Sequence, residues 1–204
     1  MTLRFDESKL TTQLSALPPS RRVAFAALVA ERLAPALSSS PDNGSDSPLM
    51  TIRPITDGIW LRLSSPELHD PTEASRDVAT CMQLLVDNAE KWAVSLPFAE
   101  DAVAAVAYTL RCEATGSAQE AAYAGRRGYE AIDKYVVDSS SPDLNMRGGE
   151  FRILEDVRIQ GELSYQIGDL GSLLSLADQD QEGLVALREA ARRHAHVFLG
   201  KRHC

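Results

Sequence analysis

Residues 21–37, RRVAFAALVAERLAPAL, decide the fold of this chain, because they form an almost wholly apolar segment of helical length. Thirteen of the fifteen residues from Val23 to Leu37 are Ala, Val, Leu, Phe or Pro, and the only charges are Glu31 and Arg32. The segment is shorter than the roughly 20 apolar residues that a membrane span requires. It is apolar on every side, so it predicts the buried central helix of an α-helical domain.

The composition of the whole chain agrees with a helical fold. Of 204 residues, 44% are hydrophobic, 25% are charged and only 6% are aromatic, and Ala, Leu and Glu are plentiful. This mix favours helices, and no run alternates apolar and polar residues for the length of a strand. We expect an all-α fold: a single domain over residues 1–204, a bundle of about seven helices, with mobile polar loops near 38–48 and 139–149.

Helix boundaries and apolar stripes can be read locally. Asp6 or Ser8 caps a first helix that ends at Pro18, Ser117-x-x-Glu120 forms a capping box, and Asp178 caps the last helix. A helix opening at Asp70-Pro71 is expected to bury Val78, Met82, Leu85, Ala89 and Trp92. A long helix from Glu150 to about Leu176 is expected to carry an apolar stripe of Ile153, Val157, Leu163, Ile167, Leu170 and Leu174.

Charge is distributed unevenly along the chain. The net charge is −8. When the chain is divided into residues 1–142, 143–182 and 183–204, the middle segment is the most densely acidic, with nine acidic and three basic residues. Residues 183–204 carry one acid and five bases. An acidic chain disfavours nucleic acid and anionic membranes as main partners and is compatible with a basic protein partner.

The cysteines and the N-terminus point to a reduced cytoplasmic protein. Three cysteines at long spacings form no disulfide framework and no zinc motif, and the first residues lack the apolar region of a secretory signal. Cys81 and Cys112 lie in apolar segments, where a buried structural thiol is the favoured interpretation. Arg111 beside Cys112 would lower the thiol pKa if that cysteine were reactive.

Motifs for catalysis, cofactor or metal binding are missing from the sequence. It contains no GxxxxGK[ST], GxGxxG, GxSxG or HExxH pattern, and His194 and His196 point away from each other on a helix. We expect no metal, no cofactor and no catalytic residue, and the chain is interpreted as non-enzymatic. Glu31 and Arg32 are interpreted as a buried ion pair with another helix, with Arg111 or Asp101 as a partner, in preference to a catalytic carboxylate.

Two charged sets are candidates for a surface role. The basic set, interpreted as a solvated helix face in preference to a phosphate-binding site, is Arg188, Arg192, Arg193, Lys201 and Arg202. The acidic set is the candidate patch for a basic partner and comprises Glu155, Asp156, Glu162, Asp169, Asp178, Asp180 and Glu182.

Three segments resemble the YjaG-like family of bacterial helical proteins, a family of unknown function. They are VAFAALVAERLAP (Val23–Pro35), ITDGIWLRL (Ile55–Leu63) and PFAEDAVAAVAYTL (Pro97–Leu110). The first is the specific one, and the loop 38–48 and the basic tail depart from the family. The resemblance implies an all-α fold and supplies no catalytic or ligand residues.

Three hypotheses about function follow. The first is a cytoplasmic immunity protein that binds and neutralises a bacterial toxin domain, contact-delivered or secreted, through its acidic patch. The second is a housekeeping helical protein that self-associates or binds another protein. The third is an enzyme whose site is assembled from residues far apart in the sequence.

Overall fold

The computed structural model describes residues 2–37, 48–68, 70–95, 98–139, 153–177 and 180–195, without the side chains at positions 66, 71, 91 and 93–95. These residues form eight α-helices and two short 3₁₀ helices, and none of them is in a β-strand. The elements are α1 (Glu7–Ser15), α2 (Pro19–Leu33), η1 (Ala34–Leu37), α3 (Pro48–Ser64), η2 (Pro66–Leu68), α4 (Pro71–Ser95), α5 (Ala99–Thr115), α6 (Ala118–Ser139), α8 (Val157–Ser175) and α9 (Gln181–His194). The all-α prediction is confirmed. Apart from their ends, the predicted loops 38–48 and 139–149 lie outside the described residues.

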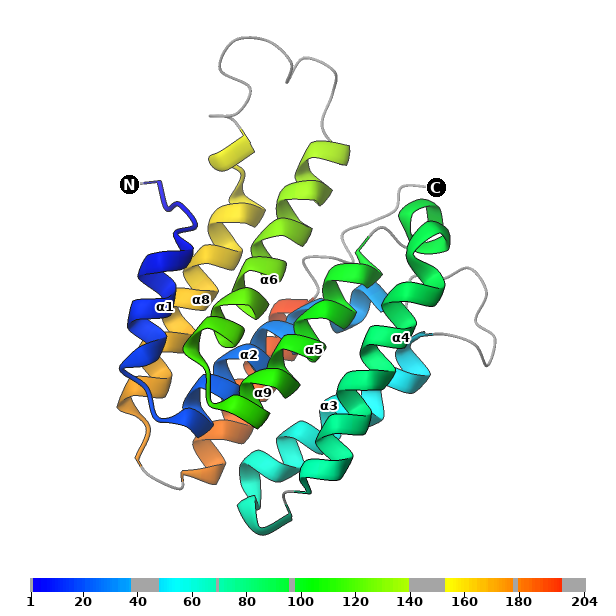
Figure 1. Ribbon diagram of the computed structural model, residues 1–204. Coiled ribbons are helices and arrows are strands. Elements are labelled where there is room, and N and C mark those ends of the chain that lie inside the picture. Colours follow the sequence, from blue (N-terminus) through cyan, green and yellow to red (C-terminus); the bar gives the residue numbers. More distant parts are fainter. Residues whose placement is uncertain are drawn as a thin grey trace.

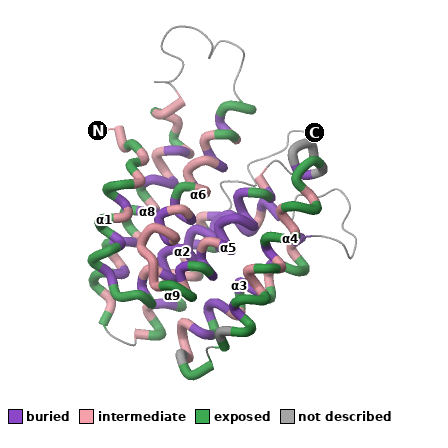
Figure 2. The backbone as a smooth tube through the Cα atoms, viewed as in Figure 1, coloured by how far each residue is buried: buried purple, intermediate pink, exposed green. Residues whose placement is uncertain are grey.

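Helix α2 is the centre of the molecule. Every residue from Val23 to Leu33 is buried, and α3, α5, α6, α8 and α9 all pack against the helix. Figure 2 shows its tube buried along almost its whole length, and Figure 1 shows α4 at the outer edge, beside α5 and α3. The segment predicted to be one helix up to Leu37 tightens into a 3₁₀ turn at its end, η1.

Small side chains explain how α5 lies so close to α2. Ala99, Ala102 and Ala105 on α5 are at most 1% exposed, and α2 contributes a similar run of buried alanines. Because the distance between two helix axes depends on the side chains at their contact, alanines let the backbones approach closely. The two alanine-rich helices therefore form the middle of one continuous core.

Several helix boundaries follow the sequence signals. The Asp6 side chain accepts a hydrogen bond from the Lys9 backbone N–H (2.9 Å), and Gly116 ends α5 with a left-handed φ of 66°. The Ser117 hydroxyl accepts from the Glu120 backbone N–H at 3.4 Å, which is one half of the predicted capping box. The Ser117 N–H donates to the Thr115 hydroxyl, and the Glu120 side chain pairs with Arg111.

Other boundaries need correction. The predicted helix from Glu150 is described from Ile153, and α8 itself starts at Val157, because Asp156 interrupts the helix and caps α8 through the Arg158 N–H. Helix α9 is capped by Asp180, which accepts from the Gly183 N–H, and Asp178 lies outside the described residues.

The predicted buried stripes of α4 and α8 are partly wrong. On α4, Met82 is 46% exposed and Ala89 is also exposed, and Cys81 takes the buried position beside Met82. On α8, the residues expected inside but found exposed are Val157, Ile167 and Leu174, and the buried face instead consists of Ile159, Glu162, Leu163, Gln166, Leu170 and Leu173. Two of the α8 positions are polar, so apolar periodicity alone could not find this face.

Candidate functional site

The two charges of the apolar segment, Glu31 and Arg32, enter separate clusters on different sides of α2. Successive helical residues point about 100° apart, so these neighbours do not face each other. Both are 1% exposed. The prediction that the pair reaches charges on other helices is confirmed, but neither predicted partner is involved, because Arg111 pairs with Glu120 and Asp101 with Arg127.

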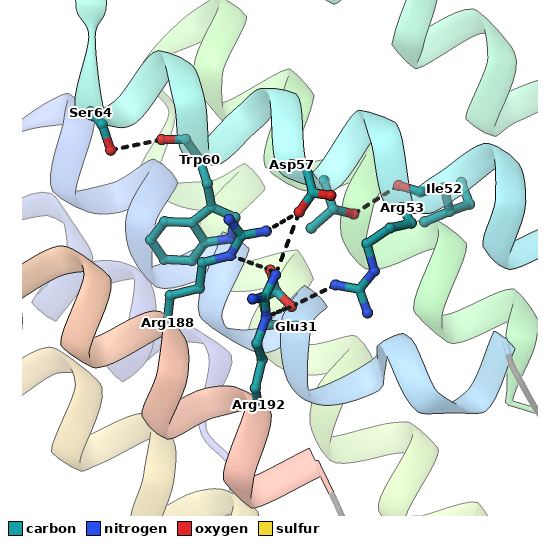
Figure 3. Close-up of polar contacts among 9 residues, drawn as sticks. Glu31, Ile52, Arg53, Asp57, Trp60, Ser64, Arg188 and Arg192 are labelled. Carbon is teal, nitrogen blue, oxygen red and sulfur yellow. Dashed lines mark hydrogen bonds and ion pairs between the residues drawn. The ribbon is translucent and has the colours of Figure 1, made fainter.

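Glu31 lies at the centre of a cluster of three arginines from two other helices (Figure 3). Its Oε1 accepts from Arg188 Nε at 2.6 Å, and its Oε2 accepts from Arg53 at 3.1 Å and from Arg192 Nε at 3.2 Å. Asp57 on α3 also accepts from Arg188 and Arg192. We call these five residues the Glu31 cluster; it joins α3 and α9 to the central helix.

Burial differs among the three guanidinium groups of the Glu31 cluster. Arg188 is the deepest, with 18% of its side chain exposed, and its guanidinium carbon lies 5.3 Å from the centre of the Trp60 ring. This is the range of a cation–π contact. The side chains of Arg53 and Arg192 are 37% and 44% exposed, so the cluster opens to solvent on their side.

Arg32 forms a second cluster with α8. Its Nε and one terminal nitrogen donate to the two oxygens of Glu162 at 3.0 and 3.1 Å, and its other terminal nitrogen donates to Asp169 at 2.6 Å. Gln166 adds a hydrogen bond to Glu162 at 2.9 Å and one to the Gly125 carbonyl at 2.8 Å. We call Arg32, Glu162, Gln166 and Asp169 the Arg32 cluster.

One guanidinium shared by two buried carboxylates sets the protonation behaviour of the Arg32 cluster. Burial opposes charge on Arg32, but Glu162 and Asp169 outweigh it and raise the pKa of the guanidinium. For Asp169 burial prevails, so its pKa lies above the usual value even though Arg32 is close. Burial also lowers the pKa of the neighbouring His194, whose ring stacks on Tyr165.

The seven acidic residues predicted as a partner-binding patch do not share one exposed face. Glu162 is buried and Asp169 is largely enclosed, both against Arg32. Asp156 and Asp180 cap helices, and Asp156 also pairs with Arg158. Glu155 and Glu182 are exposed. Interhelical ion pairs and helix caps therefore engage four of the six described acids that made this segment look like a surface patch.

The basic set is also placed differently from the prediction. Arg188 and Arg192 neutralise the buried Glu31, so they are not simply a solvated face. Arg193 is exposed, and Lys201 and Arg202 lie outside the described residues.

The two described cysteines, Cys81 and Cys112, lie where their thiols are unreactive. Cys81 and Cys112 are fully buried, and burial raises the pKa of each thiol to about 12. Arg111, expected to favour a thiolate at Cys112, is not among the groups that shift it. Since the thiolate is the nucleophile, neither residue is suited to covalent chemistry.

Helix α4 carries an acidic surface that the sequence reasoning did not single out. Residues 67–91 contain six carboxylates, one arginine and one lysine. Asp87 and Glu90 are exposed, and within the described residues neither forms an ion pair. Met82 and Val86, 46% and 73% exposed, are the apolar members of this surface. A count of charge along this segment could have found it, because six acids against two bases is the same ratio as in 143–182.

A hollow of about 170 Å³ borders this helix where it meets α5. Its lining combines apolar and charged side chains and consists of Met82, Leu85, Ala89, Glu100, Ala104, Ala107, Tyr108, Arg111 and Arg127. We call the exposed residues Met82, Val86, Asp87 and Glu90 the α4 surface, and the hollow adjoins it at Met82.

Neither a metal site nor a membrane span is found among the described residues. No group of three or more His, Cys, Asp or Glu side chains there could hold a metal ion. No helix in that part of the chain combines the length and the apolar character needed to cross a membrane.

Comparison with known proteins establishes the fold. The chain is similar to the crystal structure of a DUF416 family protein from Shewanella baltica OS155, with a TM-score of 0.73 over 90% of this chain and 93% of that one. It shares the fold of that protein. The two sequences are 18% identical, so the likeness concerns the fold alone, and the YjaG-like resemblance stays a prediction. Neither a family model nor a curated protein matches the chain.

Proposed function

We propose that this protein is a cofactor-free binding protein that recognises a basic protein partner through the α4 surface. The observation that carries the proposal is the combination of exposed apolar side chains, Met82 and Val86, with the exposed carboxylates Asp87 and Glu90 on one helix. Protein interfaces combine an apolar centre with a polar rim, and complementary charge selects the partner.

The distribution of charge supports α4 over α8 as the recognition surface. The acids of α8 are compensated inside the molecule by Arg32, whereas those near the C-terminal half of α4 face solvent. Compensated charges project little field, while exposed like charges steer an oppositely charged partner during its approach. The α4–α5 hollow then offers apolar contact once the partner is docked.

The kind of binding protein that we propose is the immunity protein predicted from the sequence. It would block a bacterial toxin domain by covering the basic active site of that domain. The acidic net charge of −8 and the apolar-and-acidic surface support this role. Neutralisation then needs only tight, steered binding, so no catalytic group is required of this chain.

Charge reversal on α4 tests the proposal. The tagged chain is used to capture its partner from native cells, at low salt and at about 0.5 M salt, where screening shortens electrostatic range to a few ångströms. We expect recovery of a basic protein, weakened by salt and abolished by Asp87→Lys/Glu90→Lys. The matched control, Glu155→Lys/Glu182→Lys, reverses two exposed acids of the sequence-predicted patch and should retain the partner.

Three outcomes would overturn the proposal. If the α4 variant retains the partner, the α4 surface is not the binding site. If only the control variant loses the partner, the α8–α9 acids are the recognition patch. Recovery of the chain itself as the dominant species would favour the self-associating housekeeping protein instead. If the captured partner is a toxin domain, co-expression of the wild type or of the control variant with it should rescue growth, and co-expression of the α4 variant should not.

A further inference from the structure

The Glu31 cluster carries more positive charge than its own carboxylates neutralise. Three guanidinium groups, from Arg53, Arg188 and Arg192, surround the two carboxylates of Glu31 and Asp57. The Arg32 cluster has the opposite ratio, one guanidinium for two carboxylates. A net positive, partly open cluster in a chain of net charge −8 is a local reversal of sign.

Two of the three arginines converge at the open side of the cluster. Arg53 from α3 and Arg192 from α9 both donate to the same atom, Glu31 Oε2, at 3.1 and 3.2 Å. Their guanidinium groups therefore lie next to each other. Arg188 donates to Glu31, lies against the Trp60 ring and is less exposed than either of them (Figure 3).

Both converging groups keep donors that the described contacts leave unused. A guanidinium has five N–H donors. Within the described residues, Arg53 donates only through one terminal nitrogen, Nη1. Arg192 donates through Nε and one terminal nitrogen, Nη2. With 37% and 44% of their side chains exposed, the remaining N–H groups can reach a ligand from solvent.

We infer that Arg53 and Arg192 form a binding site for a phosphate group, separate from the α4 surface and independent of the proposed protein partner. A carboxylate presents two oxygens in one plane and fits one guanidinium fork, whereas a phosphate presents three or four oxygens and bridges two forks. Phosphate also carries up to two negative charges, which compensates the unbalanced cation of the cluster. Glu31 holds the two guanidinium groups in place before the ligand arrives, which reduces the entropy lost on binding.

Calorimetric titration of the full-length chain with inorganic phosphate tests this site. We expect a dissociation constant on the order of 1 mM at low ionic strength, and at least a roughly tenfold loss of affinity in Arg53→Gln and in Arg192→Gln. Arg126→Gln is the matched control, because Arg126 is similarly exposed but lies on α6, paired with Glu130. Glycerol phosphate and acetate are titrated in parallel. Equal binding of the ester shows that the phosphate group alone is recognised, and stronger binding of the ester indicates additional contacts with a phosphorylated metabolite.

Binding of phosphate that is unchanged in both glutamine variants, or no stronger than that of acetate, would overturn the site. If a glutamine variant loses its helical circular dichroism signal, Arg53→Lys and Arg192→Lys replace it. These keep the charge but lose the fork, so affinity should still fall, and an unchanged value contradicts the inference. The Asp87→Lys/Glu90→Lys variant should bind phosphate at least as well as the wild type, which separates this site from the proposed partner surface.

Discussion

At the scale of single residues, Glu31 and Arg32 show how adjacent charges in an apolar helix become structural. Each is almost fully buried, and a buried charge is tolerated only when it is paired and hydrogen-bonded. Glu31 recruits arginines from α3 and α9, and Arg32 recruits carboxylates from α8. Together they tie three helices to α2.

Removal of Arg32 should be strongly destabilising. Arg32→Met leaves the carboxylates of Glu162 and Asp169 enclosed without a cation, and we expect a loss of roughly 3 to 5 kcal/mol in the free energy of unfolding. Urea denaturation measures it, with Arg126→Met as an exposed control that should change stability by no more than about 0.5 kcal/mol. Adding Glu162→Gln and Asp169→Asn should recover most of the loss, since the cavity then holds no charge; no recovery would show that packing, not charge, is responsible.

His194 should make stability depend on pH. Burial and the nearby Arg32 and Arg193 lower its pKa below the usual 6.5, against the opposing pull of Asp169 and Glu162. The unfolded chain therefore takes up the proton first, and stability attributable to His194 falls as the pH drops from about 7.5 to 5.5. The thermal midpoint of the wild type should decline more over this range than that of His194→Gln, which shares every other titrating group. Parallel declines would rule out a contribution from His194.

At the scale of elements, glycines on the two sides of the α6–α8 interface have different surroundings. Gly168 and Gly171 on α8 lie in open space, whereas Gly128 on α6 is tightly packed. A Cβ at Gly168 or Gly171 would meet nothing within 4 Å. A Cβ at Gly128 on α6 would lie 2.8 Å from both Glu162 Oε1 and Val29 Cγ1. Close packing of α6 onto the Arg32 cluster therefore requires glycine at 128, whereas the α8 positions carry no such requirement.

Alanine substitutions should separate the two kinds of glycine. Gly168→Ala and Gly171→Ala should each stabilise the protein by about 0.5 to 1 kcal/mol, because alanine costs less entropy in a helix and nothing obstructs it. Gly128→Ala should destabilise by about 1 to 3 kcal/mol through overpacking against Val29 and Glu162. Chemical denaturation of the three variants gives these values, and a neutral Gly128→Ala would mean that the α6–α8 interface relaxes easily.

At the scale of the whole molecule, one continuous core runs through most of the helices. It includes residues of α1, α2, α3, α4, α5, α6, α8 and α9, and both tryptophans, Trp60 and Trp92, belong to it. A smaller group of Ile132, Val136, Ile159 and Leu163 lies between α6 and α8. A shared core predicts a shared unfolding transition.

Unfolding should therefore be two-state, which also tests the predicted single domain. Tryptophan fluorescence reports on α3 and α4, and far-ultraviolet circular dichroism on all the helices. We expect both signals to change at the same urea concentration. An earlier fluorescence transition would show that α4, at the outer edge, unfolds separately (Figure 1).

Local signals predicted much of the fold, and they failed where polar residues entered the interior. The caps at Asp6 and Ser117 depend on neighbouring backbone groups, so the sequence revealed them. The buried face of α8 depends on Arg32, some 130 residues away, and its polar members Glu162 and Gln166 do not look like core residues. For the same reason, the predicted acidic patch contained charges that the interior had already used.

The sequence by itself determined that this chain is helical and that 21–37 is buried, because helix periodicity, capping and hydrophobicity act over a few residues. The tertiary structure alone decided which charges remain at the surface: Glu31 and Arg32 take partners from α3, α8 and α9, while Asp87 and Glu90 on α4 stay exposed. The physical reason is that burial and Coulomb attraction depend on distances in space. Both candidate sites, the α4 surface and the Arg53–Arg192 pair, follow from this arrangement.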